Sequence, residues 1–195
     1  MNTEIIIYGS SPTEVLCRHC VLGQVKRMVL VMILLVSSLF YGRAQTTMDY
    51  SVHANIIYHF TKYIDWPANQ KSGDFIIGVI GETPLFGELK KMIANKKAGN
   101  QKIVVRLFSP SQTTYDCHIL FLSEEESGSL KKITSRTENN SVLLVSEEAG
   151  GATRGACISF NVVSERLKLE INKNNIDQRD LSIANELLRL GTLVK

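Results

Sequence analysis

The sequence predicts an α/β fold, a three-layer sandwich around a mixed, mostly parallel sheet of about six strands that includes a C-terminal β-hairpin. Two observations predict it. From residue 50 to residue 150, short apolar runs alternate with segments of helical periodicity, which is the pattern of parallel βα units. Two adjacent β-rich runs follow, Cys157–Val163 and Arg166–Ile171, and such neighbours pair as an antiparallel hairpin.

A helix is expected first in the folded region. Trp66-Pro67 ends it, because the residue before a proline is disfavoured in the helical conformation. The apolar side chains of this helix recur at helical spacing and predict one buried face. They are Val52, Ile56, Ile57, Phe60 and Ile64.

Strands and two further helices follow. Thr83-Pro84 is expected to start a helix that ends near Asn95, since proline suits the first helical turn. Ser123 to Glu126 form a predicted capping box at the start of a third helix, and we interpret the acidic run as helix capping rather than metal binding. The apolar runs expected as strands are Phe75–Ile80, Ile103–Phe108, His118–Leu122 and Val142–Val145.

The C-terminal segment is predicted to be a helix after the hairpin. The hairpin turn, Ser164-Glu165, is unusual because it lacks the Asn-Gly pair that two-residue turns favour. The apolar stripe of the final helix consists of Ile183, Leu187, Leu188 and Leu190.

The N-terminal region has the features of a cleavable signal peptide. The apolar run Met28–Phe40 follows Lys26-Arg27, and small residues precede Gln45, as a secretory signal requires. We expect cleavage between Ala44 and Gln45. The alternative is an uncleaved membrane anchor, but a spanning helix needs about 20 apolar residues and Arg43 ends this run early.

The signal divides the chain into three parts. Residues 1–24 are an unusual preface to a signal peptide, and we interpret them as a mis-annotated extension, with translation starting at Val25. Residues 25–44 are predicted to be the signal peptide. Residues 45–195 are expected to form a single domain, since about 150 residues enclose one core.

Removal of the signal leaves a nearly neutral domain. Residues 1–44 contain four of the 22 Lys and Arg residues and two of the 19 Asp and Glu residues. The remaining 18 basic and 17 acidic side chains form no basic stripe of the kind that binds DNA or RNA. Nucleic acid is therefore not expected as a partner.

The usual catalytic and cofactor motifs are missing from the sequence. It contains no correctly spaced G-x-G-x-x-G, no G-x-S-x-G, no G-x-x-x-x-G-K-[ST] and no H-E-x-x-H. His53 and His59 are six residues apart, on nearly opposite faces of a helix, and do not form a metal-binding pair. We interpret both, with His118, as structural or surface histidines, and we expect no enzymatic activity, cofactor or metal.

Two cysteines remain after removal of the signal, Cys117 and Cys157. In the oxidising compartment that an exported protein enters, one alternative is a structural disulfide between them. The other is two separate buried thiols. A bridge requires the two Cα atoms to lie within about 7 Å of each other.

Polar residues around the hairpin are candidates for a recognition surface. Glu170 and Asn172 alternate with apolar residues and share one face of a strand. One interpretation is a solvated face; the other is a polar patch edged by aromatic side chains from the first helix. The predicted partner or ligand surface consists of Phe60, Tyr63, Trp66, Glu170, Asn172 and Arg179.

In their order along the chain, several segments together resemble the YfiR-like family of periplasmic regulators. One is Asn55–Pro67, the helix that ends in Trp-Pro, and another is Leu169–Asn172 followed by Leu187–Leu190. Between them, Ile77–Gly81 and Cys117–Leu122 lie where the family has its first strand and its Cys-bearing strand. The resemblance covers about residues 50 to 193, essentially the whole domain.

The resemblance implies a regulatory role in the periplasm. Well-understood members bind the sensor portion of an inner-membrane diguanylate cyclase, lower cyclic-di-GMP output and restrain biofilm formation without catalysing a reaction. For this chain the resemblance implies an inner-membrane signalling partner and a homodimer. It carries over Phe60, Trp66, Pro67, Glu170 and Asn172 as family-pattern positions.

The chain departs from the family pattern at the hairpin turn Ser164-Glu165 and at Ala184-Asn185-Glu186, so the partner need not be a cyclase of the known kind. The alternative function is a periplasmic small-molecule-binding or sensor module. In that case Phe60, Tyr63 and Trp66 would be stacking walls around a ligand of unknown identity. A regulator that senses a ligand would combine the two functions.

Overall fold

A computed structural model describes residues 28, 32, 49–163 and 166–195. Met48–Lys195 forms one compact unit, and this unit is described by itself. The expected signal peptide, apart from residues 28 and 32, its cleavage site, the N-terminal extension and the turn Ser164-Glu165 lie outside the described residues. Among the described residues, no helix is both long and apolar enough to span a membrane.

The elements of the domain alternate between helices and strands. The first half contains α2 (Tyr50–Tyr63), β1 (Ile64–Asp65), the 3-10 helix η1 (Ala68–Gln70), β2 (Phe75–Ile80), α3 (Leu85–Ile93), β3 (Lys97–Ala98), β4 (Gln101–Phe108) and β5 (Ile119–Leu122). The second half contains the 3-10 helix η2 (Glu124–Ser129), α4 (Leu130–Thr137), β6 (Leu143–Ser146), the 3-10 helix η3 (Gly151–Arg154), β7 (Ile158–Val163), β8 (Arg166–Asn172), α5 (Lys173–Asp177), β9 (Ser182–Ile183), α6 (Asn185–Leu188) and β10 (Gly191–Val194).

The main sheet confirms the predicted fold class. Its eight strands lie in the order β10-β8-β7-β6-β5-β2-β4-β3. Pairing is parallel except between β7 and β8 and between β3 and β4. The predicted hairpin is therefore present, and the strand count exceeds the expected six because β3 and β10 add an edge each.

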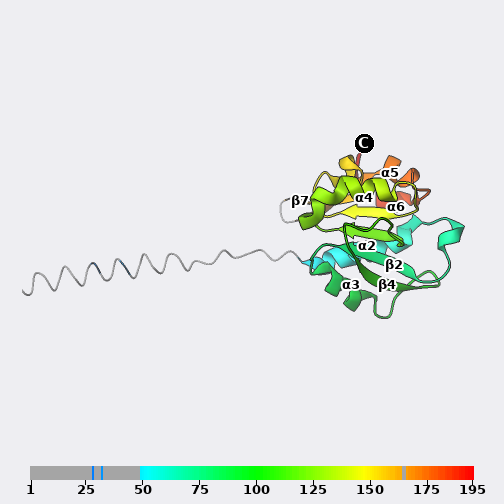
Figure 1. Ribbon diagram of the computed structural model, residues 1–195, viewed down its shortest axis with the longest axis horizontal. Coiled ribbons are helices and arrows are strands. Elements are labelled where there is room, and N and C mark those ends of the chain that lie inside the picture. The colour runs from blue at the N-terminus through cyan, green and yellow to red at the C-terminus, as the bar shows by residue number, and fades with distance from the viewer. Residues whose placement is uncertain (1–27, 29–31, 33–48, 164–165) are drawn as a thin grey trace, which may run out of the picture. The chain divides into compact units, whose positions relative to one another are not determined.

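Helices cover both faces of this sheet, with α2 and α3 on one side and α4 on the other (Figure 1). The centre of the α2 layer is a group of three buried phenylalanines, Phe60 of α2, Phe121 of β5 and Phe160 of β7. The ring centroids of Phe60 and Phe121 lie 6.4 and 6.0 Å from that of Phe160. The first helix is thus anchored on the sheet by the apolar stripe that predicts it.

Local signals explain where α2 begins and ends. The Asp49 side chain accepts a hydrogen bond from the Ser51 amide at 2.9 Å, which caps the helix. Ile64 is already extended, and Trp66-Pro67 follows two residues later, where continuation as a helix is disfavoured. The prediction for this helix is confirmed except at Val52, which is expected on the buried face but is 45% exposed, while His53 beside it is buried.

The predicted C-terminal helix is wrong in extent. Only Asn185–Leu188 is helical, and Gly191–Val194 then extends as the parallel edge strand β10 against β8. Gly191 lies so close to Ile171 that an added Cβ would be 2.6 Å from its Cδ1. The apolar spacing favours a helix here, but the backbone N–H and C=O groups at the edge of β8 need hydrogen-bond partners. Pairing of β10 with β8 supplies them.

The predicted capping box is also wrong. Ser123 precedes η2 but makes no side-chain cap bond, and the Glu126 amide instead donates to the Ser123 carbonyl at 3.1 Å. The Ser123 hydroxyl is buried beside Gly81, where an added Cβ would lie 1.9 Å from it. Its side chain points into the domain rather than toward the start of the helix.

Candidate functional site

A cleft of about 330 Å³ lies at the end of α2, where the chain turns through Trp66-Pro67 toward the sheet. Ile64, Trp66, Phe75 and Ala98 contribute apolar walls. Its size falls at the lower end of the range for small-molecule sites, and such sites combine apolar walls with a few polar groups.

Two opposite charges line the same cleft. Lys71 Nζ lies 2.7 Å from Asp65 Oδ1, and both side chains are more than half exposed. An ion pair this exposed contributes little stability because water screens it. The two charges therefore remain available to a ligand at little energetic cost.

Trp66 is held rigidly at the wall of the cleft. Its Nε1 donates to the His118 carbonyl at 3.3 Å, and its ring meets that of Phe75 at 89° with centroids 4.9 Å apart. An edge-to-face pair of this kind adds about 0.5–1.5 kcal/mol beyond burial. The indole is buried, so little of its ring is available for a ligand to stack on.

His118 fixes the strand behind this tryptophan. Its Nδ1 accepts from the Ile76 amide at 3.0 Å, its Nε2 donates to the Gln70 carbonyl at 2.8 Å, and its ring stacks on Phe75 at 4.3 Å. Burial lowers the pKa of His118, outweighing its hydrogen bond to Gln70. The side chain is a neutral structural group, as the sequence predicts, although its link to Trp66 has no sequence signal.

The predicted aromatic wall is not present as a group. Phe60 is fully buried against the sheet, whereas Tyr63 is half-buried and stacks on His59 with centroids 6.1 Å apart. Only Trp66 borders the cleft. Tyr63 lies three positions after Phe60, and Phe60 faces the core because it belongs to the apolar stripe of α2.

Glu170 holds a loop in place. Its carboxylate accepts from the Gly150 amide at 2.8 Å, the Ser159 hydroxyl at 2.8 Å and the Asn161 amide at 3.1 Å. Partial burial alone would raise the pKa of Glu170, but the hydrogen bonds from Ser159, Gly150 and Asn161 outweigh it and lower the pKa. The carboxylate ties the start of the loop that contains η3 to the hairpin.

Asn172 and Arg179 hold the remainder of the same loop. Asn172 Nδ2 donates to the Ala152 carbonyl at 3.0 Å, and Arg179 donates to the carbonyls of Asn175 at 2.9 Å and Gly155 at 3.3 Å. Both side chains are buried. The predicted polar surface is therefore an internal brace for the η3 loop, and it faces away from α3.

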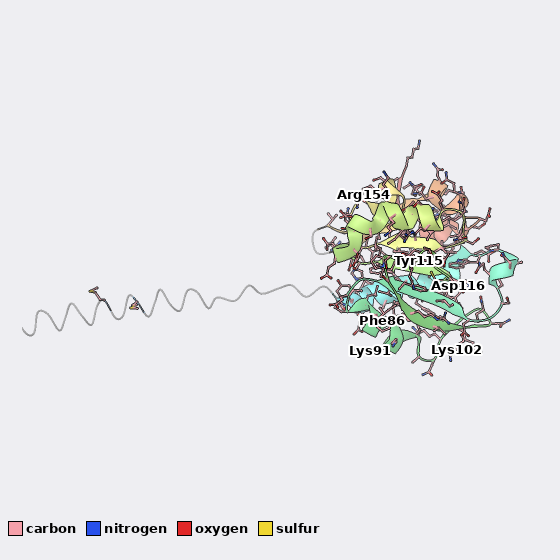
Figure 2. All side chains as sticks on the ribbon, viewed as in Figure 1. Phe86, Lys91, Lys102, Tyr115, Asp116 and Arg154 are labelled. Atoms are coloured by element: carbon pink, nitrogen blue, oxygen red, sulfur yellow. The ribbon has the colours of Figure 1, made fainter. Side chains whose placement is uncertain are left out.

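The η3 loop and α3 lie on different sides of the sheet. Figure 2 shows Arg154 of the η3 loop on the α4 side and Phe86 and Lys91 of α3 on the other side. Phe60 and Trp66 belong to the α2 side. The aromatic and polar halves of the predicted surface thus lie on different faces of the sheet. The sequence places both near the hairpin but does not show which face the η3 loop covers.

The two cysteines are separate buried thiols. Cys117 precedes β5, the strand that contains Leu120. Cys157 N donates to the Leu144 carbonyl of β6, and Leu144 pairs with Leu120, so Cys157 lies two strands away from β5. Two strand spacings alone amount to roughly 9.6 Å, beyond the reach of a disulfide. The disulfide alternative is not realised, because β6 lies between the two strands.

A second surface feature is an apolar group on the outer strands, which we call the apolar edge. Val162 pairs with Leu167, and Leu193 pairs with Ile171. Paired residues share a face, so all four lie on the face that carries buried Phe160. Beyond Phe160 this face is open: Val162, Leu193 and the adjoining Leu190 are 48, 59 and 70% exposed. The apolar edge consists of Val162, Leu167, Leu190 and Leu193.

The apolar edge ends in an open strand. Within the part of the chain that the structure describes, β10 pairs with β8 on one side and has no strand on the other. An unpaired strand edge with exposed apolar side chains is a template for association with another chain. Sequence reasoning missed it because Leu190 fits the stripe of the predicted helix.

Comparison with known proteins identifies the domain. The model of a family described as YfiR/HmsC-like matches residues 50–192. No curated protein matches the chain.

Proposed function

The chain belongs to the YfiR/HmsC-like family of periplasmic regulators, and we propose that it is exported and acts by binding the periplasmic sensor portion of an inner-membrane signalling protein. In the best-understood members of this family that partner is a diguanylate cyclase, whose cyclic-di-GMP output falls when the regulator binds. The proposed action is association rather than catalysis.

The observation that carries this proposal is the apolar edge. Isolated exposed leucines are common on protein surfaces, but here Leu193 of the open strand shares a face with Val162, and the exposed Leu190 directly precedes that strand. Burial of such side chains yields about 25 cal/mol for each Å² removed from water. A partner strand along β10 would also satisfy backbone groups that β8 leaves unpaired.

Charges around the apolar edge define the partner further. Two exposed basic side chains flank the open strand β10, Arg189 before it and Lys195 after it. A rim of this kind favours an acidic partner surface and increases the rate of its association. We therefore propose a partner segment with an apolar centre and acidic flanks.

The test is recovery of membrane partners by tagged protein from cell envelopes. Leu193→Glu places a charge in the apolar edge and should reduce recovery of a signalling protein at least tenfold. Leu107→Glu is the matched control, because Leu107 on β4 is 61% exposed and lies toward the opposite edge of the sheet. Equal recovery by both variants, or no signalling protein with the unchanged chain, would overturn the proposal.

The open edge of β10 could also pair with a second copy of the chain, as in the homodimer that the family resemblance implies. Light scattering measures this directly. If Leu193→Glu converts a dimer to a monomer and does not alter recovery of the membrane protein, the apolar edge is a dimer interface, and the partner site lies elsewhere.

A second candidate function, ligand sensing, is supported by the cleft beside Trp66. A small molecule with an apolar body against Ile64 and Phe75 and a charged end near Asp65 or Lys71 fits its lining. Mass spectrometry of the purified protein should detect a co-bound metabolite that Lys71→Glu no longer retains. A clean spectrum, together with no thermal shift from metabolite fractions, would refute this function.

A further inference from the structure

The strand order reverses between β2 and β5. The chain leaves β2 through α3 to reach β4 on one side, and then returns to place β5 on the other side of β2. In α/β sheets of this type, ligands bind beyond the carboxyl ends of the strands at such a point. The cleft beside Trp66 lies at the opposite ends of these strands, next to the first residue of β2.

Three residues stand in a row where β2, β5 and β6 end. The Ser123 amide donates to the Ile80 carbonyl at 3.0 Å and the Glu147 amide to the Leu122 carbonyl at 2.9 Å, so the ladder continues one residue past each strand. Gly81, Ser123 and Glu147 are therefore abreast, and strand alternation turns them toward α2, as it does Phe121.

The row contains hydrogen-bonding atoms without partners. Among the described residues, Ser123 Oγ and Glu147 Oε1 of this row, and His53 Nε2 of α2, are buried and make no hydrogen bond. Ser123 and His53 are both only 2% exposed. Buried polar atoms in folded proteins almost always have a partner, and each exception requires an explanation.

The chemistry of these atoms indicates which kind of ligand group would complete their hydrogen bonds. His53 Nδ1 lies 3.4 Å from the Asp49 carbonyl, which only accepts, so Nδ1 carries the proton and Nε2 presents a lone pair. Glu147 Oε2 accepts from the Glu124 amide at 2.9 Å, leaving Oε1 as a free carboxylate acceptor. The Ser123 hydroxyl also accepts. Three acceptors with one negative charge match a donor group with three N–H bonds and one positive charge.

We propose that Ser123 and Glu147 of this row, together with His53 of α2, bind a small molecule through a primary ammonium group. The ammonium would donate one hydrogen bond to each of the three orphaned atoms, and the Glu147 carboxylate would compensate its charge. The acceptors disfavour an anion. The described residues contain no group of three or more His, Cys, Asp or Glu side chains placed to hold a metal.

The entrance is next to Tyr50. Its ring centroid lies 5.0 Å from that of His53, and the side chain is half-buried. Burial, followed by a side-chain hydrogen bond to Glu147 and the charge of its carboxylate, raises the pKa of Tyr50. The three acceptors are shielded from solvent, so in this proposal a ligand would reach them by displacing the half-buried Tyr50 side chain. This inference stands independently of the proposed membrane partner.

Methylammonium and tetramethylammonium are the probes for the test, since both carry one charge but only methylammonium has N–H donors. The readout is the ¹⁵N shift of His53 Nε2 in the purified protein, with His59 and His118 as internal references. Methylammonium should move the His53 signal saturably, and tetramethylammonium should not. Equal responses to the two ions, or no saturable response to methylammonium, would overturn the proposal.

Variants assign the response to the row. Glu147→Gln should weaken methylammonium binding about tenfold, as expected for loss of a charge-assisted hydrogen bond, and Ser123→Ala should weaken it severalfold. Glu148→Gln is the matched control, because that side chain pairs with Arg154 outside the row. Unchanged binding in both row variants, together with a higher melting temperature for Ser123→Ala, would mean that only water occupies the row.

Discussion

Glu170 is expected to be a structural brace, and its removal should destabilise the domain. Glu170→Ala deletes the acceptor for three donors, the Gly150 amide, the Ser159 hydroxyl and the Asn161 amide. Hydrogen bonds to charged groups contribute about 1.5–3 kcal/mol each when buried. Because Glu170 is only half-buried, we expect a total loss of about 2–3 kcal/mol in the free energy of unfolding.

Urea denaturation at neutral pH measures this loss. For a chain of this size, each kcal/mol lowers the melting temperature by about 2–4 °C, so Glu170→Ala should melt roughly 5–10 °C lower. Glu170→Gln retains an acceptor oxygen and should lose only about 1 kcal/mol. Lys168→Ala is the control, because that exposed side chain lies on the same strand two residues away.

The pH dependence adds a second check. The pKa of Glu170 is lowered in the folded state from its ordinary value of 4.5, so its contribution is present above about pH 4.5 and disappears as the pH falls through the folded-state pKa. Wild type and Glu170→Ala should therefore converge in stability in acid. A loss below about 0.5 kcal/mol at neutral pH, the size of an ordinary surface substitution, would refute the brace and restore Glu170 as a candidate for the partner surface.

Three further predictions concern the walls of the cleft and the buried thiols. Trp66→Ala should cost about 3–5 kcal/mol in denaturation experiments, as for other buried large aromatic side chains, and a cost below 1 kcal/mol would mean that the indole is not packed as described. Burial lowers the pKa of His118 below 6.5, so below about pH 6.5 the unfolded chain binds more protons than the folded one and the stability should fall. His118→Gln should flatten this dependence of stability on pH. An unchanged slope would contradict the role of His118. Burial raises the pKa of Cys117 and Cys157, so neither should react with a thiol reagent before unfolding, and a mass loss of two hydrogens in the native protein would instead reveal a disulfide.

Local patterns were sufficient for the centre of the fold. The apolar stripe of α2, its stop at Trp66-Pro67 and the apolar runs of β2, β5 and β6 all depend on neighbours in sequence, and the structure confirms them apart from the exposed Val52. The edges were not predictable in the same way. Leu187 and Leu190 fit a helical stripe, but Gly191 and the open side of β8 favour β10.

The candidate site follows the same division. Alternation along β8 correctly puts Glu170 and Asn172 on one face, but the fold of the Gly150–Gly155 loop over that face depends on contacts distant in sequence. A short polar strand pattern is the same whether the face meets water or a loop. The burial of Arg179 therefore had no local signal.

The contact between the apolar edge and a membrane signalling protein is tested most directly by photo-crosslinking in living cells. A photoreactive side chain at position 193 should form a covalent adduct with an inner-membrane signalling protein, and one at position 107 should not. Adducts from both positions, or only a dimer of this chain from position 193, would contradict the proposed mode of action.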